Sequence, residues 1–182
     1  MTEGNAMTEP PLQIRLLAGA DIAPMVAAFQ AIGWDMPAAK YQRYLAEQKA
    51  GKRTVLVAFL EEAFAGYLTV VWQPDYPPLK AEGIPEIQDF NVLPQCRRRG
   101  IGTRLMDAAE ALVAERSPVV GIGVGLYADY GSAQRLYVQR GYIPDGRGIT
   151  YEDRFVTPGE MVRVDDGLLL HFTKTLRRPP TP

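Results

Sequence analysis

Two N-terminal segments carry apolar residues at the spacing of helices. The first follows Asp21, a plausible N-cap, and ends at Gly33. Its apolar positions are Ile22, Met25, Val26, Phe29 and Ile32. The second begins near Pro37 and carries two tyrosines and a leucine on one face. Residues 12–16 alternate weakly between apolar and polar positions, which favours a first strand before both helices.

The middle of the chain has the composition of strands. Residues 54–59 and 64–71 are rich in β-branched and aromatic residues, and the short connection between them predicts a hairpin. The proline-rich segment 73–85 predicts a loop. Residues 84–92 return to strand character. Simple alternation along this strand would place Glu86, Gln88, Phe90 and Val92 on one face and Ile87, Asp89 and Asn91 on the other.

The C-terminal half alternates helices with strands. Residues 101–114 carry a helical apolar stripe, and residues 119–127 form the next expected strand. Ser132 opens a short helix whose C-terminal glycine suits a left-handed cap. Residues 144–167 are glycine-rich and are predicted to be irregular, and residues 168–176 close the fold as a strand.

These elements predict a single α/β domain with a mixed central sheet flanked by helices, in the order β-α-α-β-β-β-α-β-α-β-β. Neither an internal repeat nor a change in composition marks a second domain. We expect the domain to span residues 12–176, between a flexible tail at residues 1–11 and a disordered tail at residues 177–182. A chain of 182 residues buries roughly 70% of its unfolded surface, which is enough for a core without disulfides.

Charge and composition narrow the possible functions. The chain has 20 basic and 21 acidic residues, and its net charge of −1 gives no overall field that would attract nucleic acid or an anionic membrane. The single Cys96 excludes an intramolecular disulfide, and with the single His171 it cannot build a zinc site, so no metal is expected. Because no early apolar run has the length of a signal peptide or a membrane span, we expect a cytoplasmic protein.

The strongest candidate chemistry lies where the strand at residues 84–92 gives way to the helix at residues 101–114. Gly100 and Gly102 lack a Cβ, so an anion can approach the main chain closely, and the helix that starts there presents its unpaired N–H groups. Four arginines add local positive charge, namely Arg97, Arg98, Arg99 and Arg104. Several aligned amides suit a diphosphate better than a single carboxylate.

Two other phosphate loops are excluded. A Walker loop requires Gly-Lys-Ser/Thr at its end, but Gly102 is followed directly by Thr103 and no lysine is present. The glycine-rich run at residues 121–125 lacks the third glycine of a dinucleotide fingerprint, since Leu126 stands at that position. We interpret this run as part of a strand.

Two segments carry a resemblance to a known family. Arg97-Arg98-Arg99-Gly100-Ile101-Gly102 fits the pattern Arg/Gln-x-x-Gly-x-Gly/Ala. The segment from Ala133 to Tyr142 fits A-x-x-hydrophobic-Tyr-x-x-x-Gly-Phe/Tyr at the expected distance. In both, the chain resembles the GNAT N-acetyltransferase superfamily. The resemblance implies the GNAT (acyl-CoA N-acyltransferase) fold over nearly the whole chain, and an acyltransferase that uses acetyl-CoA as cosubstrate.

The resemblance also implies where acetyl-CoA binds. The glycine loop would hold the pyrophosphate, and the strand before it would pair with the pantetheine arm. The implied contacts are Asn91, Val92, Leu93, Arg97, Arg98, Arg99, Gly100, Ile101, Gly102, Thr103, Arg104, Ser132 and Tyr137. Many members carry an asparagine three residues before the motif alanine. This chain has Tyr130 there, with Ser132 as a possible substitute.

Catalytic roles follow from the same resemblance. The backbone N–H of Val92 would stabilise the oxyanion, and Tyr137 would protonate the departing thiolate, although a tyrosine at its position can also be an aromatic that only packs on the sheet. Glu86 is the candidate general base, on the same face of its strand as Val92. Other carboxylates compete for this role, namely Asp89, Glu152 and Asp153, and Glu86 itself can also be a solvated strand-edge residue.

We therefore expect an N-acetyltransferase that moves an acetyl group to a primary amine by direct transfer in a ternary complex. The long loops at residues 73–85 and 144–167 favour a covered pocket and hence a small-molecule acceptor. The alternatives are a protein or peptide N-acetyltransferase and a non-catalytic acyl-CoA-binding sensor. The expected partners are acetyl-CoA and the amine, without nucleic acid or membrane. Homodimers are common in the family, so a homodimer is one alternative for the oligomeric state.

Overall fold

The computed structural model describes residues 11–176, and the predicted tails, apart from Pro11, lie outside the described residues. The described chain forms one 8-stranded sheet with the order β1-β2-β3-β4-β5-β8-β6-β7. The strands are β1 (Leu12–Leu16), β2 (Arg53–Leu60), β3 (Ala63–Val71), β4 (Glu86–Val92), β5 (Val119–Gly125), β6 (Ile143–Tyr151), β7 (Arg154–Phe155) and β8 (Leu168–Thr175). The helices are α1 (Ile22–Gln30), α2 (Ala38–Lys49), α3 (Pro77–Glu82), α4 (Ile101–Ala114) and α5 (Gly131–Gln139).

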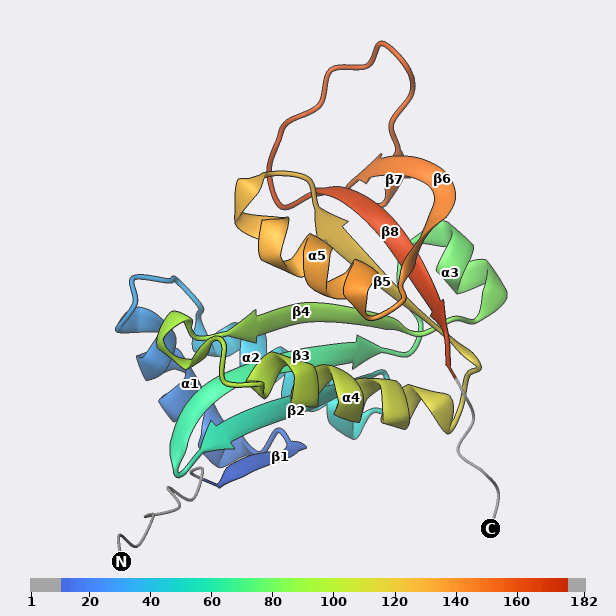
Figure 1. Ribbon diagram of the computed structural model, residues 1–182. Coiled ribbons are helices and arrows are strands. Elements are labelled where there is room, and N and C mark those ends of the chain that lie inside the picture. The colour runs from blue at the N-terminus through green and yellow to red at the C-terminus, as the bar shows by residue number, and fades with distance from the viewer. Residues whose placement is uncertain (1–10, 177–182) are drawn as a thin grey trace, which may run out of the picture.

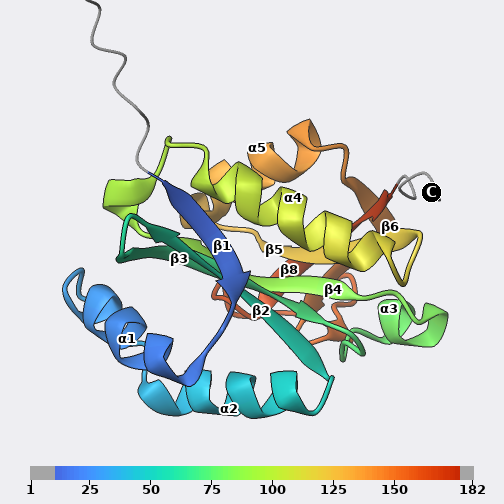
Figure 2. The same ribbon diagram turned by 90° about the horizontal axis from the view of Figure 1, so that it is seen from below.

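Helices cover both faces of the sheet. In Figure 2, α1 and α2 lie on one side, and α4 and α5 lie on the other. Each side has its own core. Phe29, Tyr41 and Tyr67 belong to the core under α1 and α2, whereas Leu105 and Tyr137 belong to the core under α4 and α5. The predicted mixed α/β fold with helices around one sheet is confirmed, and its element order agrees broadly with the prediction.

The sheet splits between its two central strands. Strands β4 and β5 are parallel and pair only at Glu86 with Gly121 and at Ile87 with Ile122. Figure 1 shows the two strands side by side near α3 and apart at their C-terminal ends. Because a parallel pair that diverges leaves backbone groups without ladder partners, the second half of β4 presents its edge to the gap.

The predicted alternation along β4 is wrong, because the strand contains a bulge. The register with β3 shifts between Tyr67 and Thr69, and Asp89 adopts a φ of 50°. One extra residue in β4 therefore turns the following side chains over. Asp89 lies on the α2 side, where the Tyr44 hydroxyl donates to its carboxylate, and Phe90 packs with the core under α4. Alternation cannot reveal a bulge when no glycine marks it.

The proline-rich segment also departs from the prediction. It contains the short helix α3, with Pro77 at its start and Gly83 in a left-handed C-cap with a φ of 66°. Proline is tolerated in the first turn of a helix, where its missing N–H has no intrahelical partner. The leucine of this helix, Leu79, is buried beside Gly121 of β5, where a Cβ would lie 2.3 Å from its Cδ1. The glycine in β5 thus makes room for α3.

The glycine-rich segment 144–167 is more regular than predicted. Its first part belongs to β6, which pairs with β8 on both sides of an irregularity between Pro144 and Ile149. A tight turn at Glu152 and Asp153 then leads into β7. Both turn residues have positive φ, at 50° and 61°. Within residues 11–176, no helix is long and apolar enough to cross a membrane.

Candidate active site

A cleft of about 1220 Å³ opens where β4 and β5 diverge. Its walls come from β4, from the N-terminus of α4, from α5 and from the connection between α1 and α2. Among the predicted site residues, those that line it are Glu86, Asn91, Val92, Arg97, Arg98, Gly100, Ile101, Gly102, Thr103, Ser132 and Tyr137. The volume exceeds that of a typical drug-sized pocket, so the cleft has room for a large ligand.

Three predicted contacts lie away from the cleft lining. The Leu93 side chain is 1% exposed and packs in the core under α1 and α2. Arg99 and Arg104 are exposed on the surface around the start of α4 and do not line the cleft. The resemblance marks the loop only as a unit, and it cannot tell which of its arginines line the cleft.

The glycine loop has the geometry of an anion cradle. Gly100 is the N-cap of α4 with a φ of 73°, and Arg98 has a φ of 59°, so the backbone turns twice through the left-handed region. A Cβ at Gly102 would lie 3.0 Å from the Phe90 ring, which explains the need for glycine in the first turn. The unpaired N–H groups of this helix N-terminus face the cleft lining, where they can bind a phosphate.

The backbone of Val92 is directed toward the gap between the strands. The N–H of Leu93 donates to the carbonyl of Ala65 at 2.9 Å, and Val92 stands opposite Gly66. In an antiparallel ladder, neighbouring residues direct their backbone groups to opposite sides, so the Val92 N–H is directed away from β3. The Val92 carbonyl accepts from Arg97 Nε at 3.1 Å.

Glu86 is a buried carboxyl on the wall of the cleft. It is 3% exposed, and Gln88 Nε2 donates to its Oε2 at 2.8 Å. Burial raises the pKa of Glu86 to about 7, and the negative charge of Asp153 adds to this effect, whereas the Gln88 hydrogen bond opposes it. A carboxyl whose pKa lies near neutrality is suited to exchange protons under physiological conditions.

The competing carboxylates have different surroundings. Asp89 is held by the Tyr44 hydroxyl and by Lys40 Nζ at 3.3 Å, so its charge is already compensated. Asp153 lines the cleft, and burial raises its pKa. Glu152 is exposed on the same turn and does not line the cleft. Glu86 therefore combines the deepest burial with a place in the cleft wall.

Tyr137 lies on α5 and lines the cleft opposite β4. It is 5% exposed, and its ring packs against Tyr142 at 5.9 Å between centroids. Burial raises the pKa of its hydroxyl, so the hydroxyl keeps its proton at neutral pH. Among the described residues its hydroxyl has no hydrogen-bond partner, since burial alone shifts its pKa.

Tyr130 takes the place of the asparagine that many members of the resembled family carry. Its ring packs over Gly125, where a Cβ would lie 2.4 Å from the Tyr130 Cδ2. Its hydroxyl donates to Asp166 at 2.9 Å, and the Tyr127 hydroxyl donates to the same carboxylate. These three residues line the cleft together. No sequence pattern connects Asp166 with Tyr127 and Tyr130, because it is distant from them along the chain.

The segment from the end of α1 to the first turn of α2 also lines the cleft. Trp34 and Met36 reach the cleft from the connection between α1 and α2, and Lys40 reaches it from the first turn of α2. His171 is 1% exposed on β8, with its Nε2 3.5 Å from Glu86 Oε1. No sequence pattern connects these two residues, which are separated by 85 positions.

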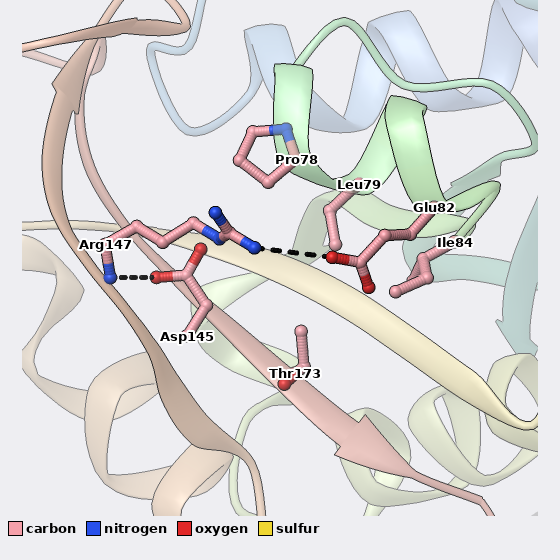
Figure 3. A pocket seen from close by; sticks show the side chains of 7 residues that line it. All are labelled: Pro78, Leu79, Glu82, Ile84, Asp145, Arg147 and Thr173. Atoms are coloured by element: carbon pink, nitrogen blue, oxygen red, sulfur yellow. Dashed lines mark hydrogen bonds and ion pairs between the residues drawn. The ribbon is translucent and has the colours of Figure 1, made fainter.

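A second, smaller hollow lies near α3 and is separate from the cleft. Its volume is about 130 Å³, and Figure 3 shows that Arg147 reaches across it to pair with Glu82. Asp145 on its wall accepts from the backbone N–H of Arg147 at 3.0 Å. The polar groups here satisfy one another. In the described part of the chain, no group of three or more metal-ligating side chains is assembled.

Comparisons with known proteins agree with this geometry. No curated protein sequence matches the chain. Among solved structures, the fold resembles a ribosomal-protein-alanine N-acetyltransferase from Brucella melitensis, with 18% identity, a TM-score of 0.66, and coverage of 90% of this chain and 99% of that one. It also resembles a spermidine/spermine N-acetyltransferase from Vibrio cholerae, with 13% identity, a TM-score of 0.63, and coverage of 90% and 92%.

A third similar structure is an acetyltransferase from Salmonella typhimurium solved with its cofactor acetyl-CoA. It shares 17% identity, with a TM-score of 0.64 and coverage of 94% of this chain and 97% of that one. At these identities the likeness concerns the fold. The family itself is shown by the sequence model of the acetyltransferase (GNAT) family, which matches residues 24–142. The chain therefore belongs to the acetyltransferase (GNAT) family, whose enzymes use acetyl-CoA as cosubstrate.

Proposed function

We infer that this acetyltransferase moves an acetyl group from acetyl-CoA to a primary amine of a small molecule, by direct transfer while both substrates are bound. The observation that carries this inference is the position of Glu86. Its buried carboxyl, with a pKa raised to about 7, lies in the same cleft as the glycine loop and the free edge of β4. A proton acceptor and an anion site thus line one cavity.

The cofactor would be bound mainly by backbone groups. The N–H groups at the start of α4, with Arg97 and Arg98 beside them, suit the pyrophosphate. The unpaired edge of β4 offers backbone groups to the pantetheine arm, as an added strand would. This arrangement brings the thioester to the level of Val92, whose N–H is free to bind the carbonyl oxygen.

The amine must lose a proton before it can attack. An alkylammonium has a pKa of about 10.4, so its deprotonation at neutral pH costs roughly 4–5 kcal/mol. Glu86 accepts this proton, the amine nitrogen forms a bond with the acetyl carbon, and the carbon–sulfur bond breaks. The Val92 N–H stabilises the oxyanion, and Tyr137 donates its proton to the leaving thiolate. The acylated nitrogen then releases its excess proton, which restores the Tyr137 hydroxyl, so the described residues supply each proton transfer.

The acceptor is proposed to be small because the cleft is partly covered. Asp153 and Asp166, both from the segment 144–167, line the cleft, so one of the two long loops does contribute to its wall. The other, residues 73–85, does not line it and forms α3 instead. The likeness to both a polyamine and a ribosomal-protein acetyltransferase leaves the peptide acceptor as the alternative.

The test is release of free thiol from acetyl-CoA with a panel of monoamines, polyamines, amino acids, aminoglycosides and short peptides, together with a calorimetric titration of acetyl-CoA. Release that depends on a small amine supports the proposal, and release with peptides alone replaces it with the alternative. Binding of acetyl-CoA without release from any acceptor would favour a sensor. Glu86→Gln serves as the matched variant, which should bind acetyl-CoA normally but release thiol slowly.

A further inference from the structure

His171 occupies a closed slot behind Glu86. The Tyr76 ring stacks on its imidazole at 3.6 Å between centroids and 5° between planes. Across the β5–β8 ladder its register partner is Gly123, where a Cβ would lie 3.3 Å from His171 Nε2. The side chain is 1% exposed. The stack on Tyr76 and the contact with the glycine backbone fix the plane of the ring.

The two ring nitrogens face two different groups. Nδ1 lies 3.5 Å from Thr150 Oγ1, and Nε2 lies 3.5 Å from Glu86 Oε1. Among the described residues, Nε2 has no hydrogen bond. Burial lowers the pKa of His171 to about 4, opposed by the charge of Asp145, so the imidazole is neutral near pH 7. A neutral imidazole carries one N–H and one lone pair.

The position of Thr150 selects which nitrogen carries the hydrogen. Thr150 is fully buried, and among the described residues His171 Nδ1 is the only partner of its hydroxyl. If Nδ1 accepts from that hydroxyl, then Nε2 carries the N–H and directs it at the Glu86 carboxylate. The other tautomer would leave the Thr150 hydrogen without an acceptor and would direct a lone pair at a carboxylate. Only the first tautomer satisfies all three groups.

Glu86 then has a neutral donor beside each oxygen. Gln88 Nε2 donates to Oε2 at 2.8 Å, and His171 Nε2 approaches Oε1. The charged groups that act on Glu86 come from elsewhere: Asp153 and Asp75 raise its pKa, and Arg53 lowers it. A lysine or arginine in place of His171 would stabilise the carboxylate strongly and weaken it as a base. A neutral N–H orients the carboxylate without this loss.

We propose that His171, as its Nε2–H tautomer, is a positioning residue that holds the Glu86 carboxylate from the side remote from the cleft. The Nε2 to Oε1 separation of 3.5 Å shortens when an acceptor amine fills the cleft and Glu86 is ionised, because hydrogen bonds of a catalytic group tighten in the complex. The proposal rests on Glu86 as the base of the proposed function.

The tautomer is tested without any assay of activity. His171 is the only histidine of the chain, so ¹⁵N NMR of histidine-labelled full-length protein gives one pair of imidazole signals. We expect the pattern of a protonated Nε2 and an unprotonated Nδ1 at neutral pH. The Nε2 shift should follow a titration near pH 7 that disappears in Glu86→Gln. An Nδ1–H tautomer, an imidazolium, or an Nε2 shift that does not respond to Glu86 would overturn the proposal.

Kinetics test the positioning role separately. His171→Phe keeps a ring for the stack on Tyr76 but removes both nitrogens. We expect kcat to fall by up to about 100-fold while the KM for acetyl-CoA stays constant, and the acidic limb of the pH profile to move to higher pH because the carboxylate loses a donor. An unchanged pH profile in a variant that binds acetyl-CoA normally would contradict the proposal.

A matched pair guards against misfolding of the phenylalanine variant. Thr150→Val removes the hydroxyl that fixes the tautomer, whereas Thr150→Ser retains a hydroxyl at this position. We expect the valine variant to lose the pure Nε2–H pattern and the serine variant to keep it. Identical spectra in both would show that Thr150 does not select the tautomer, which overturns the argument. If no amine is acetylated while the tautomer is as expected, the proposed function fails and the structural coupling of His171 to Glu86 stands.

Discussion

The buried carboxyl of Glu86 makes the stability of the fold depend on pH, and the Glu86→Gln variant isolates this dependence. Burial raises the pKa of Glu86 from its ordinary value of 4.5 to about 7, whereas the unfolded chain keeps the ordinary value. Between these two values the folded state binds the proton and the unfolded state does not. The contribution of Glu86 to stability is therefore fully present below pH 4.5 and is lost as pH rises through about 7.

The magnitude follows from the gap between the two pKa values. At about 1.36 kcal/mol per pKa unit, the gap between 4.5 and about 7 corresponds to about 3 kcal/mol. Glutamine has the same shape and does not ionise. The free energy of unfolding of Glu86→Gln, relative to the wild type, should therefore increase by about 3 kcal/mol from about pH 4.5 to about pH 8.

The assay is urea unfolding of both proteins at the two pH values, from which the change in relative stability is obtained. The imidazole of His171 changes the pH dependence of stability in the opposite direction. Its pKa is lowered from 6.5 to about 4, so its contribution to the free energy of unfolding increases with pH up to 6.5. Because His171 Nε2 lies 3.5 Å from Glu86 Oε1, this contribution is measured separately by repeating the comparison in the His171→Phe background. Glu62→Gln, in the exposed turn between β2 and β3, is the matched control and should show no such change.

A relative increase below about 1 kcal/mol would refute the reasoning, because a desolvated carboxyl must carry this linkage. The assignment of Glu86 as the general base would then be wrong as well. The expected combination is a variant that is more stable at alkaline pH and slower in acetyl transfer. This combination is typical of active sites, where burial shifts the pKa of a catalytic group and lowers the stability of the fold.

Three further predictions concern the same cleft. Tyr137→Phe should lower kcat by about 100-fold in thiol release without weakening acetyl-CoA binding, and an unchanged kcat would remove the acid role. Gly100→Ala places a side chain on a residue whose φ is 73°, which is unfavourable for any residue with a Cβ. We expect the free energy of unfolding in urea to fall by about 1–2 kcal/mol and acetyl-CoA to bind more weakly by calorimetry. If the loop relaxed freely, neither effect would appear. Asp153→Asn removes a charge that raises the pKa of Glu86, so the acidic limb of kcat/KM against pH should move to lower pH, and a move to higher pH would contradict this assignment.

Local patterns predicted most of the secondary structure. The hairpin of β2 and β3, the strand β1 and the helix α4 follow from residue type and spacing along short segments, and the structure confirms them. The glycine loop was also found from the sequence, because its need for residues without a Cβ is a backbone property that neighbouring residues reveal. The short helix α3 was missed, although Pro77 at its first position was a usable signal.

The composition of the cleft could be predicted only in part. Glu86 and Tyr137 were identified by their position relative to motifs, and both line the cleft. The face assigned to Asp89 was wrong because a bulge in β4 depends on the register with β3, which the sequence of β4 alone does not contain. Leu93 was assigned to the cofactor site, but its side chain packs in the core.

The sequence by itself determined the family, the fold and the loop that suits a diphosphate, since each depends on short segments whose spacing is fixed by covalent geometry. Tertiary structure decided the environment of the proposed base. Glu86 acquires a pKa near neutrality because segments distant along the chain bury it and place the charge of Asp153 near it. His171 on β8 approaches it across Gly123 for the same reason. Desolvation is a property of the assembled fold, and no segment carries it alone.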